Sequence, residues 1–187
     1  MADFTIAYKI TMQNEGGYNP GNGEAETYKG IDRSQNPKWA GWAIIDAVKR
    51  TKPRSMNIEL AKNGMLQIDI SQFYKTNYWN TLKLSEIKDQ QIANTMFDCS
   101  VNPCIDTAGE VLQKAVNSLK IQHLVVDGNV GEKTIAAVNE LIDLGKAKDL
   151  YNAIKAIRVA NYEERAQRTP SAKQWLAGWI KRTGEYA

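Results

Sequence analysis

Apolar side chains recur at helical spacing along most of this chain. The first such segment, Phe4 to Asn14, has apolar residues at positions 4, 7, 8 and 10, which is the one-sided pattern of an amphipathic helix. Later segments share this spacing: Trp42 to Val48, Met65 to Asn77, Asp89 to Val101, Thr107 to Leu119, Glu132 to Leu144, Ala147 to Arg168, and a last one after Thr169. The pattern predicts a mainly α protein.

The stretch from residue 18 to residue 30 differs, because it is polar and rich in glycine. Its Asn22-Gly23 dipeptide favours a tight turn, so we expect a small β-hairpin or an irregular loop there. The Gly16-Gly17 pair just before it predicts a left-handed stop to the first helix. Glu15 would then lie in the last turn of that helix.

A carboxylate in a last helical turn faces the negative end of the helix dipole. Burial would act in the same direction, and both effects would raise the pKa of Glu15. A carboxyl group that stays protonated can donate its proton to the oxygen of a glycosidic bond. On position alone, a solvated surface glutamate is the commoner outcome.

The tryptophans Trp39 and Trp42 open the second helical segment. Aromatic rings of this kind stack on sugar faces in some binding sites and pack in the core in others. Core packing is the stronger expectation for Trp42, whereas both readings stay open for Trp39.

Two features near the end of the chain indicate structural roles rather than ligand binding. Arg158, Arg165 and Arg168 make a charged side on the long helical segment, which predicts a solvated face. Trp175 and Trp179 lie one helical turn apart, a spacing that predicts core packing more often than a ligand platform.

Composition is that of an ordinary globular protein, with 43% hydrophobic and 24% charged residues in a chain of 187. The net charge of +3 is too small and too scattered to indicate a nucleic-acid partner. No apolar run reaches the length needed to span a membrane. The N-terminal residues lack a basic region followed by a long apolar one, so we expect no secretory signal.

Cysteine and histidine are scarce, which limits the chemistry available. Cys99 and Cys104 are expected to be reduced structural residues, and His123 is the only histidine. The chain therefore offers neither a recognisable metal site nor a cysteine and histidine pair for hydrolysis, and we expect no cofactor.

Several motifs occur together in an order that resembles glycoside hydrolase family 108. At the N-terminus these are Asn14-Glu15-Gly16-Gly17-Tyr18 and Thr27-Tyr28-Lys29-Gly30-Ile31. Downstream, the matching residues are Tyr78-Trp79, Phe97-Asp98, Val101-Asn102, Leu112-Gln113, Asp127-Gly128 with Val130-Gly131, and Gly178-Trp179 with Arg182. The second half resembles the predicted peptidoglycan-binding region of such proteins.

The resemblance implies a lysozyme-like N-acetylmuramidase whose catalytic acid is Glu15. Some family members are described as secretion activator proteins. We expect Tyr18, Tyr28 and Trp39 to contact the glycan of peptidoglycan, which is the implied partner. Without a recognisable signal, the chain would be made in the cytoplasm and act on the cell wall after export or lysis.

The second catalytic group is less certain, because the loop after the acid departs from the family pattern. Family members commonly have an aspartate, a glycine pair and a threonine there, whereas this chain reads Asn22-Gly23-Glu24-Ala25-Glu26-Thr27. Alternation along a strand would place Glu24 and Glu26 on one face. Glu26 is slightly favoured because it precedes the matching Thr27, which would hold water.

The expected architecture is mainly α and lysozyme-like, with the small hairpin or loop at the active-site cleft. Residues 1–86 would form the catalytic region and residues 87–187 a helical peptidoglycan-binding region packed on it. Two other functions stay open. One is a non-catalytic wall-binding or secretion-accessory protein, and the other is a helical interaction module that resembles the family only in its core.

Overall fold

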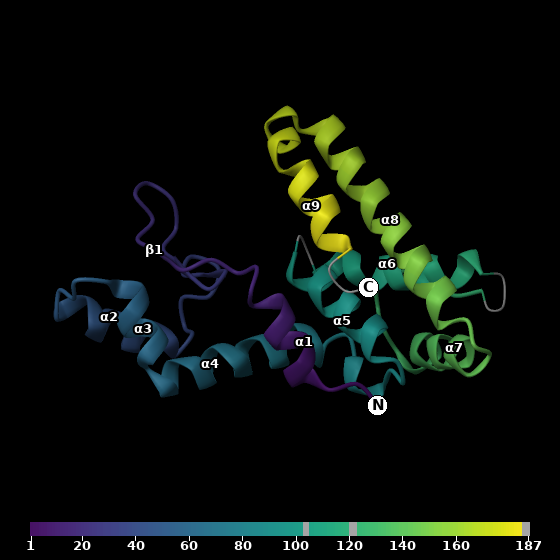
Figure 1. The fold of residues 1–187 in the computed structure, drawn as a ribbon, viewed down its shortest axis with the longest axis horizontal. Helices are drawn as coiled ribbons and strands as arrows, with labels where there is room; N and C mark the ends of the chain where they lie inside the picture. The colour runs from purple at the N-terminus through teal and green to yellow at the C-terminus, as the bar shows by residue number, and fades with distance from the viewer. Residues whose placement is uncertain (103–104, 120–122, 185–187) are drawn as a thin grey trace. The chain divides into compact units, whose positions relative to one another are not determined.

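The computed structural model describes residues 1–102, 105–119 and 123–184. Helices dominate the fold (Figure 1). The strands form one three-stranded antiparallel sheet in the order β1-β2-β3. The expected mainly α, lysozyme-like class with a small β element is therefore confirmed. In the described part of the chain, no helix is long and apolar enough to cross a membrane.

The chain divides into two compact units. One comprises Lys9–Asn77, and the other combines Met1–Tyr8 with Tyr78–Ala187. The division expected at residues 86 and 87, and the packing of the second region on the first, stay expectations. We call the first the sheet unit and the second the helical unit.

The sheet unit contains the end of α1, the sheet, and three helices joined by short loops. Its elements are α1 (Phe4–Thr11), β1 (Tyr18–Asn19), β2 (Thr27–Tyr28), β3 (Ile31–Asp32), α2 (Gly41–Arg50), α3 (Met56–Lys62) and α4 (Gly64–Tyr74). A π-helical segment, Lys75–Trp79, follows α4. The core of this unit includes Tyr28, Ile31, Trp42, Ile45, Leu60, Leu66, Ile70 and Tyr74.

Two turns shape the sheet. Asn22 and Gly23 both have positive φ in the loop from β1 to β2, and the Glu24 amide donates to the Gly21 carbonyl there. The turn expected at this dipeptide is therefore present. Lys29 and Gly30, with φ of 50° and 77°, join β2 to β3. Positive φ at both central residues is the condition for a type I′ hairpin turn, which suits the twist of the flanking strands.

The helical unit is built around α5, which is buried along most of its length. Its further elements are a short 3-10 helix at Leu84–Glu86, α5 (Gln90–Val101), α6 (Ile105–Ser118), α7 (Glu132–Asp143), α8 (Ala147–Arg168), a 3-10 helix at Pro170–Trp175 and α9 (Leu176–Thr183). Every residue from 92 to 100 is buried. Helix α8 packs on α5, α6 and α9, and its pairing with α9 is visible in Figure 1.

The Asp127-Gly128 turn is fixed by Gln113 of α6. The Gln113 side chain donates to Asp127 Oδ1 at 2.7 Å, and its own oxygen accepts from the amides of Asp127 and Gly128 at 3.0 and 2.9 Å. Gly128 has φ of 76°, as expected for this turn. A side chain on Gly109 would collide with the Gly128 carbonyl, so Gly109 allows the turn to approach α6 closely.

Three expectations for the helical unit are wrong. Helix α6 begins at Ile105, two residues before the start expected at Thr107. Arg158 is 2% exposed because α8 turns its 150, 154, 158, 162 and 166 positions toward the core. Trp175 is 60% exposed, since it ends the 3-10 segment and lies outside the packed face of α9. Cys104 and residues 121–122 lie outside the described residues.

Candidate functional site

Glu15 lies beyond the first helix. Helix α1 ends at Thr11, and two tight turns follow, in which the amides of Gln13 and Asn14 donate to the carbonyls of Ile10 and Thr11. The prediction that Glu15 occupies the last helical turn is therefore wrong. Gly16 and Gly17 are not among the residues with positive φ, so the expected left-handed stop is absent as well. A helix dipole acts only within its last turn, and that argument no longer applies to Glu15.

The Glu15 carboxylate turns toward Gly30 in the β2–β3 turn. A Cβ atom placed on Gly30 would lie 2.7 Å from Glu15 Oε2 and 2.8 Å from the Tyr74 hydroxyl. Tyr74, from the end of α4, donates its hydroxyl to the Lys29 carbonyl at 2.6 Å. Gly30 therefore leaves the space in which the carboxylate and the phenol come together. Glu15 is half-buried, so part of its side chain remains open to solvent.

The second glycine of the motif is required by a close contact with α3. A Cβ atom on Gly17 would lie 2.5 Å from Asn57 Oδ1, and that same oxygen accepts from the Tyr18 amide at 2.7 Å. The Asn57 side chain thus fixes the chain direction between Glu15 and β1. This contact gives the glycine a packing role in place of the predicted helix stop.

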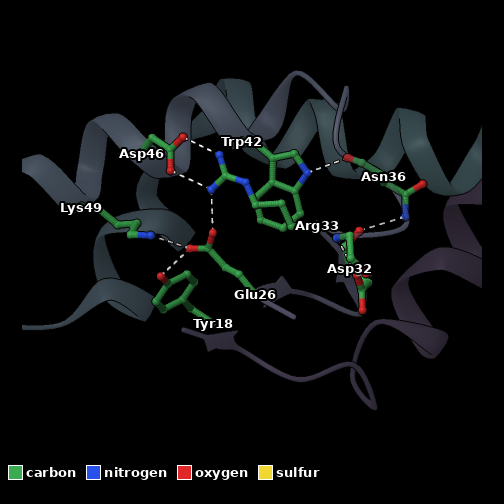
Figure 2. A network of polar contacts seen from close by, with 9 residues as sticks. Tyr18, Glu26, Asp32, Arg33, Asn36, Trp42, Asp46 and Lys49 are labelled. Atoms are coloured by element: carbon green, nitrogen blue, oxygen red, sulfur yellow. Dashed lines mark hydrogen bonds and ion pairs between the residues drawn. The ribbon is translucent and has the colours of Figure 1, made fainter. Parts of the chain in front are cut away.

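Glu26 accepts hydrogen bonds from three side chains, as Figure 2 shows: one from β1, one from the loop after β3 and one from α2. Its Oε1 accepts from the Tyr18 hydroxyl at 2.6 Å and from Lys49 Nζ at 2.8 Å, while its Oε2 accepts from Arg33 Nη1 at 2.6 Å. The side chain is 11% exposed. Arg33 in turn makes a two-pronged ion pair with Asp46, at 2.8 and 2.6 Å. We call these five residues the Glu26 network.

The network keeps Glu26 ionised. Burial by itself would raise the pKa of Glu26, but the hydrogen bonds from Lys49, Tyr18 and Arg33 outweigh it and lower that pKa. The pKa of Asp46 is also lowered, chiefly by its hydrogen bonds from Arg33. A carboxylate stabilised in this way is a weak base, because protonation would cost it three charged or polar partners.

Trp42 supports the network from α2. The Arg33 guanidinium lies over its ring, 5.1 Å from the centroid, and Trp42 Nε1 donates to the Asn36 carbonyl at 2.8 Å. Trp42 is 3% exposed, so the core role expected for it is confirmed. A cation over the face of an aromatic ring is attracted by the ring quadrupole, which helps to fix the Arg33 fork.

Asp32 is a carboxylate that the sequence pattern did not single out. It pairs directly with Thr27 across β2 and β3, so both side chains lie on one face of the sheet. Its Oδ1 accepts from the Ser34 amide, the Ser34 hydroxyl and the Gln35 amide. The Ser34 hydroxyl contributes most to lowering the pKa of Asp32.

Strand β2 is shorter than the expected alternation requires. It covers only Thr27 and Tyr28, so Glu24 and Glu26 precede it, and the expectation that they share a strand face is wrong. Glu24 is exposed in the loop. The side chain of Tyr28 is enclosed, at 1% exposure, and its predicted contact with substrate stays a prediction.

Trp39 is half-buried at the edge of the sheet unit. Its ring packs edge-on against Trp42 with centroids 5.1 Å apart and also contacts Phe73 at 6.1 Å. A shallow hollow of about 330 Å³ lies beside it and is lined by residues 35–39 and Phe73. Trp39 therefore has both a packed face and an accessible edge, and its predicted sugar contact stays a prediction.

Metal ligands do not cluster anywhere in the described ranges, where no group of three or more histidine, cysteine or acidic side chains is placed to hold an ion. Cys99 is buried, and desolvation raises the pKa of its thiol to about 11. The thiol therefore stays protonated near neutral pH and is a poor nucleophile. His123 is exposed.

Comparison with known families identifies the family of this chain. A family model described as Glycosyl hydrolase 108 matches residues 8–103, which include Glu15 and the whole Glu26 network. The chain belongs to this family. A second model, described as Predicted Peptidoglycan domain, matches residues 107–184. Together the two matches support a glycoside hydrolase that acts on peptidoglycan.

Solved structures show the same fold. The chain resembles the structure of Brucella abortus SagA with a TM-score of 0.63 at 21% identity, over 98% of this chain and 90% of that one. A search of curated proteins found no significant match. Six residues of this site lie outside the set predicted from the sequence: Tyr74, Asn57, Asp32, Arg33, Asp46 and Lys49. Only Asp32 and Arg33 lie near the N-terminal motif along the chain; the others meet it through folding.

Proposed function

We propose that this chain is an N-acetylmuramidase that cleaves the β-1,4 bond between N-acetylmuramic acid and N-acetylglucosamine. Glu15 is the general acid that protonates the leaving oxygen. The observation that carries the proposal is the placement of the half-buried Glu15 carboxylate beside Gly30 and the Tyr74 hydroxyl. Family membership supports the reaction class, and the match to a peptidoglycan domain supports the substrate.

The surroundings of Glu15 suit a proton donor. Glu15 is half-buried, and the open part of its side chain lets a glycosidic oxygen approach. The Tyr74 hydroxyl donates to the Lys29 carbonyl at 2.6 Å, and its oxygen and Glu15 Oε2 both lie within 3 Å of the point that a Gly30 Cβ atom would occupy. Tyr74 is therefore a positioning residue for Glu15.

Glu26 and Asp32 are the two candidates for the second catalytic carboxylate. The donors to Glu26 engage both of its oxygens, which suits an anchor for the β1–β2 loop better than a base. Asp32 accepts from Ser34 and Gln35 through Oδ1 and lies beside Thr27. We therefore propose that Asp32 and Thr27 hold the attacking water and that Glu26 fixes the loop. The catalytic role predicted for Glu26 stays a prediction that its variant tests.

The stereochemical outcome follows from the separation of the two carboxyl groups. Carboxyl groups about 5 to 5.5 Å apart indicate a retaining route, and about 6.5 to 9.5 Å leaves room for water in an inverting route. A role for water beside Thr27 corresponds to the inverting route. We further propose that the chain acts on the cell wall after export or lysis.

Release of reducing ends from purified peptidoglycan tests the proposal. The wild type should release fragments that end in reducing N-acetylmuramic acid, identified by mass spectrometry, and Glu15→Gln should release none above background. Glu24→Gln is the matched control, because it makes the same change at an exposed glutamate of the loop between β1 and β2. Equal release by the wild type and Glu15→Gln would remove Glu15 from the mechanism.

Sedimentation with the cell wall distinguishes the two alternative functions. If neither protein releases fragments although both are folded and sediment with the wall, the chain is a wall-binding or accessory protein. If the folded wild type neither cleaves nor sediments with the wall, it is an interaction module that shares only the family core.

A further inference from the structure

A hollow of about 480 Å³ lies between α6 and α8 of the helical unit, with Cys99 of α5 among its lining residues. We call it the α6–α8 hollow. All of its lining residues belong to the helical unit, so it is separate from Glu15 and the Glu26 network. Its volume falls within the range of sites for small ligands, about 300 to 1,000 Å³.

The lining of the hollow carries excess positive charge. Its cationic side chains are Lys114, Arg158, Arg165 and Arg168, and its carboxylates are Glu110 and Glu164. Four positive charges against two negative ones leave a net charge of +2. Both carboxylates are already engaged, since Lys114 pairs with Glu110 at 2.8 Å and Arg168 pairs with Glu164 at 2.5 Å.

Arg158 provides a fixed positive charge in the wall of the hollow. It is 2% exposed and donates to Asp98 Oδ2 at 2.6 Å, while Arg182 donates to the other oxygen of Asp98 at 2.7 Å. Two guanidinium groups therefore share one buried carboxylate. The Nε atom of Arg158 is buried and has no hydrogen-bond partner in the described part of the chain.

Arg165 is the exposed cation of the hollow that forms no ion pair within the described ranges, whereas Lys114 and Arg168 are paired. It is exposed, and its guanidinium lies over the Trp179 ring, 5.2 Å from the centroid. Trp179 in turn packs against Tyr162 with centroids 5.3 Å apart. Among the described residues no carboxylate forms an ion pair with Arg165. Stacking on an aromatic face orients a guanidinium while leaving its in-plane donors free for a carboxylate.

We propose that the α6–α8 hollow binds a carboxylate of a short peptide, with Arg165 as the main ligand. The planar guanidinium matches a carboxylate through two parallel hydrogen bonds. Val111 and the Tyr162 ring line the same hollow and suit small apolar side chains such as methyl groups. The short peptides attached to peptidoglycan strands combine free carboxylates with alanine side chains. In naming that ligand, the inference rests on the proposed wall substrate.

Titration of the full-length wild type with a synthetic peptide tests this site. The probe is L-alanyl-γ-D-glutamyl-L-lysine with free carboxylates, followed by calorimetry, and its fully amidated analogue is titrated in parallel. We expect saturable binding of the free acid and at least about tenfold weaker binding of the amide, because the ion pair is lost.

Two variants assign the binding to the hollow. Arg165→Gln should weaken binding of the free acid at least about tenfold, since it removes the exposed guanidinium that is not paired with a carboxylate of the hollow. Arg54→Gln, an exposed arginine of the sheet unit, makes the same change of charge and should leave binding unchanged. Absence of saturable binding, equal affinity for the amide, or equal loss in both variants would each overturn the proposal.

The test is independent of catalysis, because the probe contains no glycosidic bond. Release of reducing ends without peptide binding would refute the carboxylate site and leave the muramidase proposal intact. Peptide binding that depends on Arg165, without release of reducing ends, would support the site in a protein that does not cleave the glycan.

Discussion

The Glu15 carboxylate and the Tyr74 hydroxyl converge on the same point of the backbone, the α-carbon of Gly30. Each has an oxygen within 3 Å of where a Gly30 side chain would begin, at 2.7 and 2.8 Å. The two residues come from the loop after α1 and from the end of α4, and the turn between β2 and β3 lies between them. This relationship gives the site its clearest test.

Gly30→Ala should remove activity. The new methyl group would meet both oxygens, and a φ of 77° disfavours any residue with a Cβ atom by roughly 1 to 2 kcal/mol. Gly23→Ala separates these effects, because Gly23 also has positive φ but nothing lies within 4 Å of the point that its Cβ atom would occupy. We expect both variants to lose stability in thermal unfolding and only Gly30→Ala to lose cleavage. Equal cleavage by both variants would contradict the crowding argument.

Tyr74→Phe should lower the rate of cleavage with little change in wall binding. It removes the hydroxyl that bonds the Lys29 carbonyl at 2.6 Å, at a cost of about 0.5 to 1.5 kcal/mol in unfolding free energy. The comparison is Tyr151→Phe in the helical unit, whose hydroxyl makes a longer bond of 3.4 Å to Thr183. The measurement is the turnover rate of each variant at saturating peptidoglycan. An unchanged rate in Tyr74→Phe would exclude a positioning role for Tyr74.

Glu26→Gln should make the free energy of unfolding less dependent on pH in the acid range. The pKa of folded Glu26 lies below its ordinary value of 4.5, so its ionised form stabilises the fold above that pH. This contribution is lost as the pH falls through the lower, folded pKa. Between pH 6 and about pH 3, the free energy of unfolding measured with a chemical denaturant should therefore fall less for Glu26→Gln than for the wild type.

Glu24→Gln is the control for that experiment, because Glu24 is exposed in the same loop. Its free energy of unfolding should fall with decreasing pH as that of the wild type does. If Glu26→Gln also follows the wild type, the network does not hold Glu26 in its charged form. Loss of cleavage in Glu26→Gln with unchanged stability at neutral pH would instead favour its catalytic role.

Asp98→Asn should strongly destabilise the helical unit. Asp98 is fully buried and balances the charges of Arg158 and Arg182, and removing one partner of such a pair typically costs about 3 to 5 kcal/mol. Asp143→Asn is the comparison, because its pair with Lys88 is about half exposed and such pairs contribute about 0 to 1 kcal/mol. Urea unfolding measures both, and equal midpoints would contradict the role of Asp98 as a buried counter-charge.

The sequence by itself determined the helical class, the turn at Asn22-Gly23 and the family resemblance. These features depend on local spacing and on residue types with strong backbone preferences. The position of Glu15 relative to its helix was not determined in this way. Two tight turns after Thr11 end the helix early, and Gly17 serves the contact with Asn57, a residue far along the chain.

Tertiary structure decided which charged side chains are buried in ion pairs and which are exposed to solvent. Arg158 and Arg165 lie on the same helix, yet packing buries the first against Asp98 and leaves the second exposed over Trp179. Glu26 is held as an anion because folding brings Lys49 of α2 to it and places Asp46 of the same helix against its partner Arg33. Burial and partners set the free energy of a charged group, and both depend on contacts between segments that no local pattern specifies.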